Sequence, residues 1–119
     1  MNKTILIGRL TKNPEVRYTT NGKAVCTFTL AVDRPFANKI GEHETDYVPI
    51  VLWEKPAELA GNSCAKGHRL LVEGRIQVRT YDDKDGQRHW VTEIVGDRIE
   101  FLEQKKSNST LKNDEVIPF

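Results

Sequence analysis

The chain has 119 residues, of which 38% are hydrophobic and 29% are charged, with a formal net charge of +1. This composition predicts one globular domain, and no run approaches the roughly 18 apolar residues of a membrane span. The near-neutral charge argues against a nucleic-acid partner unless positive charge is concentrated locally. The chain starts without an export signal and its two cysteines, Cys26 and Cys64, lie far apart, so we expect free thiols in a cytoplasmic protein.

The chain begins with a predicted strand and a hairpin turn. An apolar run at 3–10 has the length of a strand, Pro14 breaks it, and residues 16–18 can continue it. Asn21 and Gly22 then form a dipeptide typical of two-residue hairpin turns.

The next predicted strand, at 23–34, alternates with period two. The face that we assign to the core carries Ala24, Cys26, Phe28, Leu30 and Val32. The opposite face carries Thr27, Thr29 and Asp33. A polar loop is predicted at 35–44, with Phe36 as its one aromatic side chain.

A third strand is predicted at 45–53. Its core face carries Val48, Ile50 and Leu52, and its opposite face carries Tyr47, Val51 and Trp53. Pro49 has no backbone N–H to donate to a neighbouring strand, so we expect the strand to be an edge or to be bulged there.

One helix is predicted within 54–67. Pro56 suits its first turn and Gly67 suits its C-terminal end. Gly61 and Asn62 weaken the pattern, so the helix is expected to be short.

Two further strands are predicted at 68–81 and 89–102, joined by a hairpin turn that contains Asp85 and Gly86. In the first of them, Leu70, Val72, Ile76 and Val78 alternate with Leu71, Glu73, Arg75, Gln77, Arg79 and Tyr81. In the second, Gly96 is expected to mark a bulge or bend.

The element order, three strands, a helix and two strands, indicates an all-β fold. It matches a five-stranded OB-fold barrel with one short helix between strands 3 and 4, although the pattern alone leaves other small barrels open. The predicted domain spans 1–102, and the polar sequence after Leu102 predicts a flexible C-terminal tail.

Aromatic side chains and cations share the predicted outward faces. Tyr47 and Trp53 lie opposite the core side of their strand, and Tyr81 shares a face with Arg75 and Arg79. Single-stranded nucleic acid requires this combination, because unpaired bases stack on aromatic rings and phosphates attract spaced cations. The pattern is equally compatible with an aromatic cluster that seals one barrel end or with a protein interface.

No motif for catalysis or metal binding is present. The DDKDGQ segment lacks the ligand spacing of a calcium loop. The three histidines are not spaced as metal ligands, and the chain has neither a phosphate-binding loop nor a nucleophile elbow. We therefore expect no metal, no cofactor and no enzymatic activity.

Several stretches, taken in order, are similar to the bacterial single-stranded DNA-binding protein family. They are NKTILIGRLTKNPEVRYTTNGKAV, FTLAVDRPF, ETDYVPIVLWEKPAELA, CAKGHRLLVEGRIQVRTYDDKDGQ and VTEIV, and the similarity extends over residues 2–102 and resumes at the C-terminal tip. The resemblance implies an OB barrel that usually assembles as a homotetramer through the first strand and the sheet faces, where Leu71 could contribute.

The resemblance also implies which residues contact DNA. The family's base-stacking positions fall on Phe36, Tyr47, Trp53 and Tyr81. Its phosphate-following cations fall on Lys39, Lys55, Lys66 and Arg79, and Trp90 matches an aromatic position on the last strand whose role is either DNA contact or packing. From their faces and proximity, rather than from the resemblance, we add Arg75 and Arg88.

This chain departs from the family pattern at four positions. Phe36, Tyr47 and Tyr81 stand where tryptophan is frequent, and their smaller rings predict modestly weaker stacking. Pro49 stands at a position that is often polar or basic, which puts a local contact in doubt.

The C-terminus resembles the family's acidic tip followed by Ile-Pro-Phe. The matching segment, 113–119, contains Asp114, Glu115, Val116, Ile117, Pro118 and Phe119. The resemblance implies a docking peptide for replication, recombination and repair proteins, in which a partner buries Phe119 and captures the terminal carboxylate. From the residues alone, a frayed end or a segment packed on the barrel is the simpler interpretation.

The predicted linker, 103–112, is short for the family. A flexible coil of this length spans about 17 Å, so we expect the tip to stay near the barrel and its acids to compete with DNA for the basic face.

These inferences predict a protein that binds single-stranded DNA without sequence preference, protects it, and recruits replication, recombination and repair proteins in the bacterial cytoplasm at the nucleoid. The alternative is an OB-fold replication-restart adaptor whose exposed aromatic side chains mainly contact proteins.

Overall fold

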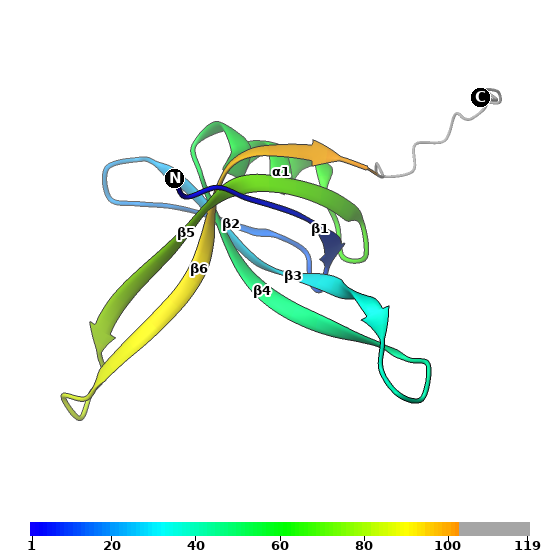
Figure 1. Ribbon diagram of the computed structural model, residues 1–119. Helices are drawn as coiled ribbons and strands as arrows, with labels where there is room; N and C mark the ends of the chain where they lie inside the picture. The colour runs from blue at the N-terminus through cyan, green and yellow to red at the C-terminus, as the bar shows by residue number, and fades with distance from the viewer. Residues whose placement is uncertain (103–119) are drawn as a thin grey trace, which may run out of the picture.

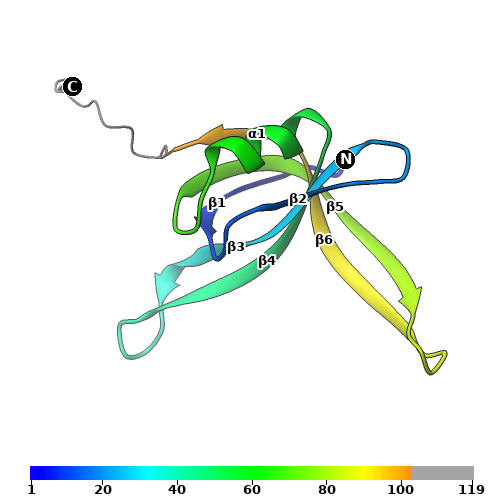
Figure 2. The same ribbon diagram turned by 180° about the vertical axis from the view of Figure 1, so that it is seen from behind.

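The computed structural model describes residues 1–102, and the predicted linker, 103–112, and tip, 113–119, lie outside them. The elements are β1 (Thr4–Leu10), β2 (Glu15–Tyr18), β3 (Ala24–Ala37), β4 (His43–Trp53), α1 (Lys55–Ser63), β5 (Arg69–Asp82) and β6 (Arg88–Phe101). Figures 1 and 2 show a curled sheet with α1 at one end and two long hairpins that diverge from it. Within residues 1–102, no helix is long and apolar enough to cross a membrane.

The strands form a closed, mixed barrel. The sheet order is β1-β5-β6-β4-β3-β2, and β1 also pairs with β3 through Arg9 with Ala31 and Leu10 with Leu30, which closes the sheet. All pairings are antiparallel except that of β4 with β6. Because β1 and β2 are the two parts of the predicted first strand, the prediction of a five-stranded OB-fold barrel, with its helix after the third strand, is confirmed.

The core faces predicted for β3 and β4 are confirmed. The largest fully buried side chains are Leu10, Leu30, Ile50, Leu52, Leu70, Val72 and Cys26. Val32 and Val48 are partly buried against this cluster. Cys26 and Cys64 are both buried. Burial raises the pKa of Cys26 to about 11, which keeps its thiol protonated at neutral pH.

The polar loop predicted at 35–44 is wrong in its extent. β3 continues to Ala37 and β4 begins at His43, so the connection shrinks to 38–42. The Asn38 side-chain oxygen accepts hydrogen bonds from the backbone N–H groups of Ile40 and Glu42, which closes this turn. Phe36 therefore lies on a strand, near the end of the β3–β4 arm (residues 33–46).

The alternation predicted for β5 does not bury Ile76 and Val78. Their side chains are 46% and 59% exposed, although they continue the period-two pattern of the buried Leu70 and Val72. β5 pairs with β1 as far as Gly74. Beyond this pairing β5 and β6 continue as the β5–β6 arm (residues 75–93), one of the two hairpins that diverge from the sheet in Figure 1, and its Ile76 and Val78 side chains stay exposed.

A bulge separates the barrel part of the β5–β6 hairpin from its arm. Glu73 pairs with Arg98 and Gly74 with Gly96, which leaves Asp97 as the extra residue, so the bulge predicted near Gly96 is confirmed. The approach at Gly74 is so close that a Cβ there would lie 2.1 Å from the Val95 carbonyl oxygen.

Of the two alternatives predicted at Pro49, an edge or a bulge, the structure confirms the edge. Pro49 pairs in regular register with Thr29 of β3, and the pairing of β4 with β6 begins only at Ile50. Its missing N–H therefore costs no hydrogen bond to β6.

The helix is short, as predicted, but Gly67 does not end it. α1 ends at Ser63, and the extended backbone of Cys64 terminates it. Gly67 instead adopts a positive φ of 87° in the connection to β5, where its N–H donates to the Leu10 carbonyl. Ala57 and Ala60 bury the helix against the barrel.

We expect Gly74→Ala to destabilise the fold by at least about 2 kcal/mol, because a methyl group there collides with a cross-strand carbonyl that cannot move without disrupting the register. Urea unfolding measures the loss. Gly86→Ala is the matched control: it has a φ of +79° but nothing within 4 Å, so it should cost only about 1 kcal/mol. Equal losses for the two variants would contradict the importance of the close approach.

Candidate nucleic-acid interface

The outward face of β4 presents two aromatic rings. Tyr47 and Trp53 are 67% and 40% exposed, and Pro49 and Val51 lie between them on the same face. Their cross-strand partners on β3 are small: Ala31 is opposite Tyr47, and Val25 is opposite Trp53. The exposure predicted for both rings is confirmed, and this face offers flat surfaces on which bases can stack.

A groove of about 370 Å³ lies between this face and the β5–β6 arm. Its lining includes Lys12, Thr29, Pro49, Val51, Arg79 and Glu93. Thr29 was predicted to lie on the outward face, whereas Lys12 and Glu93 were not predicted to be site residues. The alternation of β6 was the signal available for Glu93, whereas Lys12 reaches the groove only because the β1–β2 turn passes beside it.

Arg79 is the one predicted DNA-binding residue among the groove's lining residues, and it is paired with an acid. Its Nε donates to Glu93 Oε2 at 2.9 Å, and Gln77 Nε2 donates to the same oxygen at 2.9 Å. The Arg79 side chain is still 52% exposed, so it can approach a ligand in the groove.

Tyr81 stands on the β5–β6 arm against His89. The two rings stack with centroids 5.1 Å apart and an interplanar angle of 19°. His89 Nε2 lies 2.7 Å from Asp83 Oδ2, while Asp83 Oδ1 accepts the backbone N–H groups of Asp85 and Gln87 in the turn. The turn thus holds the imidazole, and the imidazole supports one face of the tyrosine ring.

Trp90 lies on the opposite face of the same arm. It pairs with Thr80, whereas Tyr81 pairs with His89, so Trp90 and Tyr81 point to different sides. Trp90 shares its side with the exposed Ile76 and Val78. The structure does not bring Trp90 and Tyr81 onto one surface, and the role of Trp90 stays a prediction.

The other predicted cations lie around the groove rather than in it. Lys39 is exposed in the turn of the β3–β4 arm, Lys55 begins α1 two residues after Trp53, and Lys66 follows the helix. Arg75 donates to Gln77 at 3.5 Å, and Arg88 forms an ion pair with Asp82 at 3.7 Å. These residues are distributed over separate parts of the surface.

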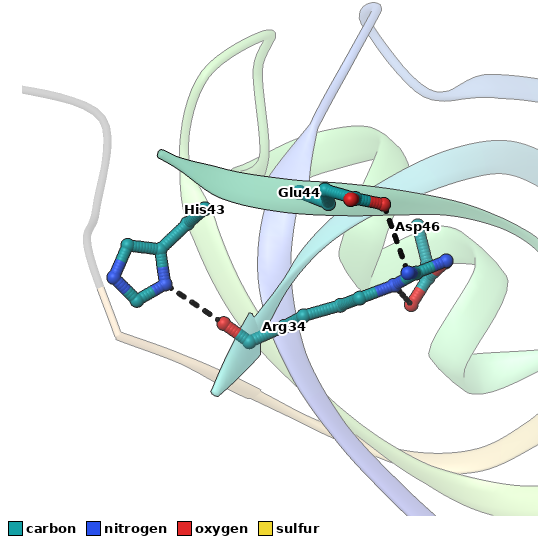
Figure 3. Close-up of polar contacts among 4 residues, drawn as sticks. All are labelled: Arg34, His43, Glu44 and Asp46. Carbon is teal, nitrogen blue, oxygen red and sulfur yellow. Dashed lines mark hydrogen bonds and ion pairs between the residues drawn. The ribbon is translucent and has the colours of Figure 1, made fainter. Parts of the chain in front are cut away.

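The β3–β4 arm carries a network centred on Arg34, which Figure 3 shows. Phe36 lines a small pocket with Arg34 and Glu44 of this network. Arg34 Nη1 donates to Glu44 at 2.9 Å, its Nη2 donates to Asp46 at 3.0 Å, and its backbone carbonyl lies 3.0 Å from His43 Nδ1. The guanidinium lowers the pKa of Asp46. These cross-strand contacts keep the arm paired and hold the Phe36 segment in an extended conformation.

Within residues 1–102, no three histidine, cysteine, aspartate or glutamate side chains gather as a metal site. The exposed rings of Tyr47 and Trp53 offer stacking, Pro49 and Val51 offer apolar contact, and Arg79 offers a charge for ion pairing.

Comparison with known proteins gives a consistent result. Residues 1–102 match the model of the single-strand binding protein family. The chain is 52% identical over 108 residues to single-stranded DNA-binding protein 2 of Listeria monocytogenes, covering 91% of this chain and 68% of that protein. It is 54% identical over 105 residues to a single-stranded DNA-binding protein of Caldanaerobacter subterraneus, covering 88% and 70%. It is 53% identical over 119 residues to single-stranded DNA-binding protein 2 of Clostridium acetobutylicum, covering 99% and 89%.

The Asp83 turn predicts a pH-dependent part of stability. The hydrogen bond from His89, followed by those from the backbone, lowers the pKa of Asp83 below its ordinary value of 3.8. A lowered folded-state pKa contributes stability that is present above pH 3.8 and is lost as the pH falls through the folded-state value. We expect Asp83→Asn to be less stable than the unmodified chain at pH 6 and the difference to shrink below pH 4.

Thermal unfolding of both proteins between pH 3 and pH 7 measures this difference. Asparagine can still accept the turn hydrogen bonds, so the variant isolates the charge. Asp85→Asn is the control, because Asp85 contacts Asp83 through its backbone N–H. A difference that is independent of pH would contradict the assignment.

Proposed function

The chain belongs to the single-strand binding protein family, and from this membership we propose that it binds single-stranded DNA without sequence preference and protects exposed strands during replication, recombination and repair. It is a DNA-binding protein and not an enzyme. The observation that carries the proposal is the outward face of β4, where two exposed aromatic rings flank Pro49 and Val51, which line a groove together with Arg79 and Lys12.

This arrangement suits an unpaired strand. Bases can stack on Tyr47 and Trp53 regardless of their identity, because every base has a π-face. Pro49 and Val51 provide apolar contact between the rings. Neither side chain has a donor or acceptor that could read a base edge, which supports tolerance of sequence.

Assembly as a homotetramer is part of the proposal. Ile5 and Ile7 of β1 are 59% and 49% exposed, and β1 pairs them with Glu73 and Leu71 of β5. An exposed apolar strip of this kind is typical of a surface that another copy covers. Sedimentation or mass measurement with and without oligo(dT) tests the assembly and the length of DNA bound.

Recruitment of replication, recombination and repair proteins by the C-terminal tip is also part of the proposal. The segment Asp114–Phe119 combines two acids with an apolar run. A partner with a basic rim and an apolar pocket can recognise both features. Because the predicted linker, 103–112, is short, we expect these acids to stay close to the DNA-binding domain.

Fluorescence quenching tests the DNA-binding proposal. In a Trp90→Phe variant, Trp53 is the remaining tryptophan, and we expect strong quenching on titration with poly(dT), because a stacked base quenches the indole. Trp53→Ala should weaken binding by about 1–3 kcal/mol. Tyr18→Ala is the matched control, because it also removes an exposed aromatic ring but lies outside the groove. No quenching at low salt would overturn the proposal and favour the protein-adaptor alternative.

Deletion of Asp114–Phe119 tests the competition between the tip and DNA. We expect the truncated protein to bind oligo(dT) more tightly at low salt, because two carboxylates no longer compete with phosphates. The difference should vanish at high salt, where charges are screened. Unchanged or weaker binding at low salt would contradict the competition.

A further inference from the structure

Among residues 1–102, Glu93 is the one charged residue that is buried, with 4% of its surface exposed. It lies on β6 in the groove described above, next to Val91 on the same face of the strand. A buried carboxylate in a groove that receives a polyanion requires an explanation, because it repels phosphate and is costly to bury unless it is paired.

The partners of Glu93 come from the neighbouring strand. Arg79 Nε and Gln77 Nε2 both donate to its Oε2 at 2.9 Å. Gln77 is the direct cross-strand partner of Glu93, and Arg79 is the next residue along β5 on the same face. Arg79 thus already holds an anion in the free protein, with the kind of charge-assisted hydrogen bond that it would donate to a phosphate.

The charges that line the groove are balanced. Lys12 and Arg79 are the cations among its lining residues, and Glu15 and Glu93 are the acids. Without Glu93 the same lining would carry one net positive charge. The acid therefore removes the local excess of positive charge that drives counterion release when a phosphate binds.

We propose that Glu93 limits the affinity of the groove by acting as an internal anion that competes with a DNA phosphate for Arg79. This inference rests on the proposed function, since it concerns how a strand enters the same groove. When a phosphate takes Arg79, Gln77 remains as a donor to Glu93, so the buried carboxylate keeps one hydrogen bond.

This change of Arg79 from Glu93 to a phosphate makes the binding of DNA weaker and easier to reverse. Part of the interaction between Arg79 and the phosphate is offset by the loss of the Arg79–Glu93 ion pair, which leaves a buried charge with a single neutral donor. A protein that coats single strands must also be displaced from them, and a weakened phosphate contact favours rapid release.

Glu93→Gln tests the proposal, because the amide keeps the size of the side chain and removes its charge. We expect oligo(dT) to bind this variant roughly three- to tenfold more tightly at low salt, a moderate gain because Arg79 is half exposed and partly screened. The slope of log K against log salt should become steeper by about 0.7 per groove, the value for one additional neutralised phosphate on a single strand.

Two controls separate this role from a structural one. In an Arg79→Gln background, Glu93→Gln should give less than half of the gain, because the competing cation is absent. Glu58→Gln makes the same charge change on α1, outside the groove, and should leave both affinity and salt slope unchanged. Equal or weaker binding by Glu93→Gln, or an undiminished gain without Arg79, would overturn the proposal.

A measurement on the unmodified protein keeps the test valid if the variant folds poorly. The NMR signal of the Arg79 Nε–H group should shift when oligo(dT) saturates the protein, because its acceptor changes from carboxylate to phosphate. An unshifted signal in a saturated complex would overturn the proposal. Failure of the unmodified protein to bind oligo(dT) would instead overturn the proposed function, so the two failures are distinguishable.

Discussion

The close approach of β5 and β6 at Gly74 and Gly96 is the constraint on which the rest of the structure depends. Before this point β5 contributes Leu70 and Val72 to the core, and beyond it the hairpin leaves the barrel. A side chain at Gly74 would collide with the cross-strand backbone of Val95 and Gly96. A side chain at Gly96 would instead collide with the core side chains of Leu52 and Val72. The arm can therefore stand beside β4, and the groove exists between them.

Balanced charge is the second organising feature. Cations on both arms are paired with acids: Arg34 with Glu44 and Asp46, Arg79 with Glu93, and Arg88 with Asp82. This pairing agrees with the net charge of +1 for the whole chain. A strand that binds here would gain from base stacking on aromatic rings, and its phosphates would have to exchange with existing ion pairs. The near-neutral sequence is thus compatible with an anionic ligand.

Predictions made from alternation were correct where they concerned only which side of a strand a residue faces. The core faces of β3 and β4 and the exposure of Tyr47 and Trp53 are confirmed, because successive side chains on a strand point to opposite sides whatever surrounds them. Alternation does not decide burial for Ile76 and Val78. Alternation places both on the core side of β5, but burial also requires a second layer, and the arm has none.

By itself, the sequence determined the strands, their two faces, the turns at Gly22 and Gly86, and the aromatic character of the exposed side, because these follow from local pattern and backbone preference. Only the tertiary structure decided which charges meet. Glu93 lies beside Arg79 because of the register between β5 and β6, and Lys12 enters the same groove because barrel closure brings the β1–β2 turn next to it. Such neighbours depend on long-range register, which period-two alternation does not specify.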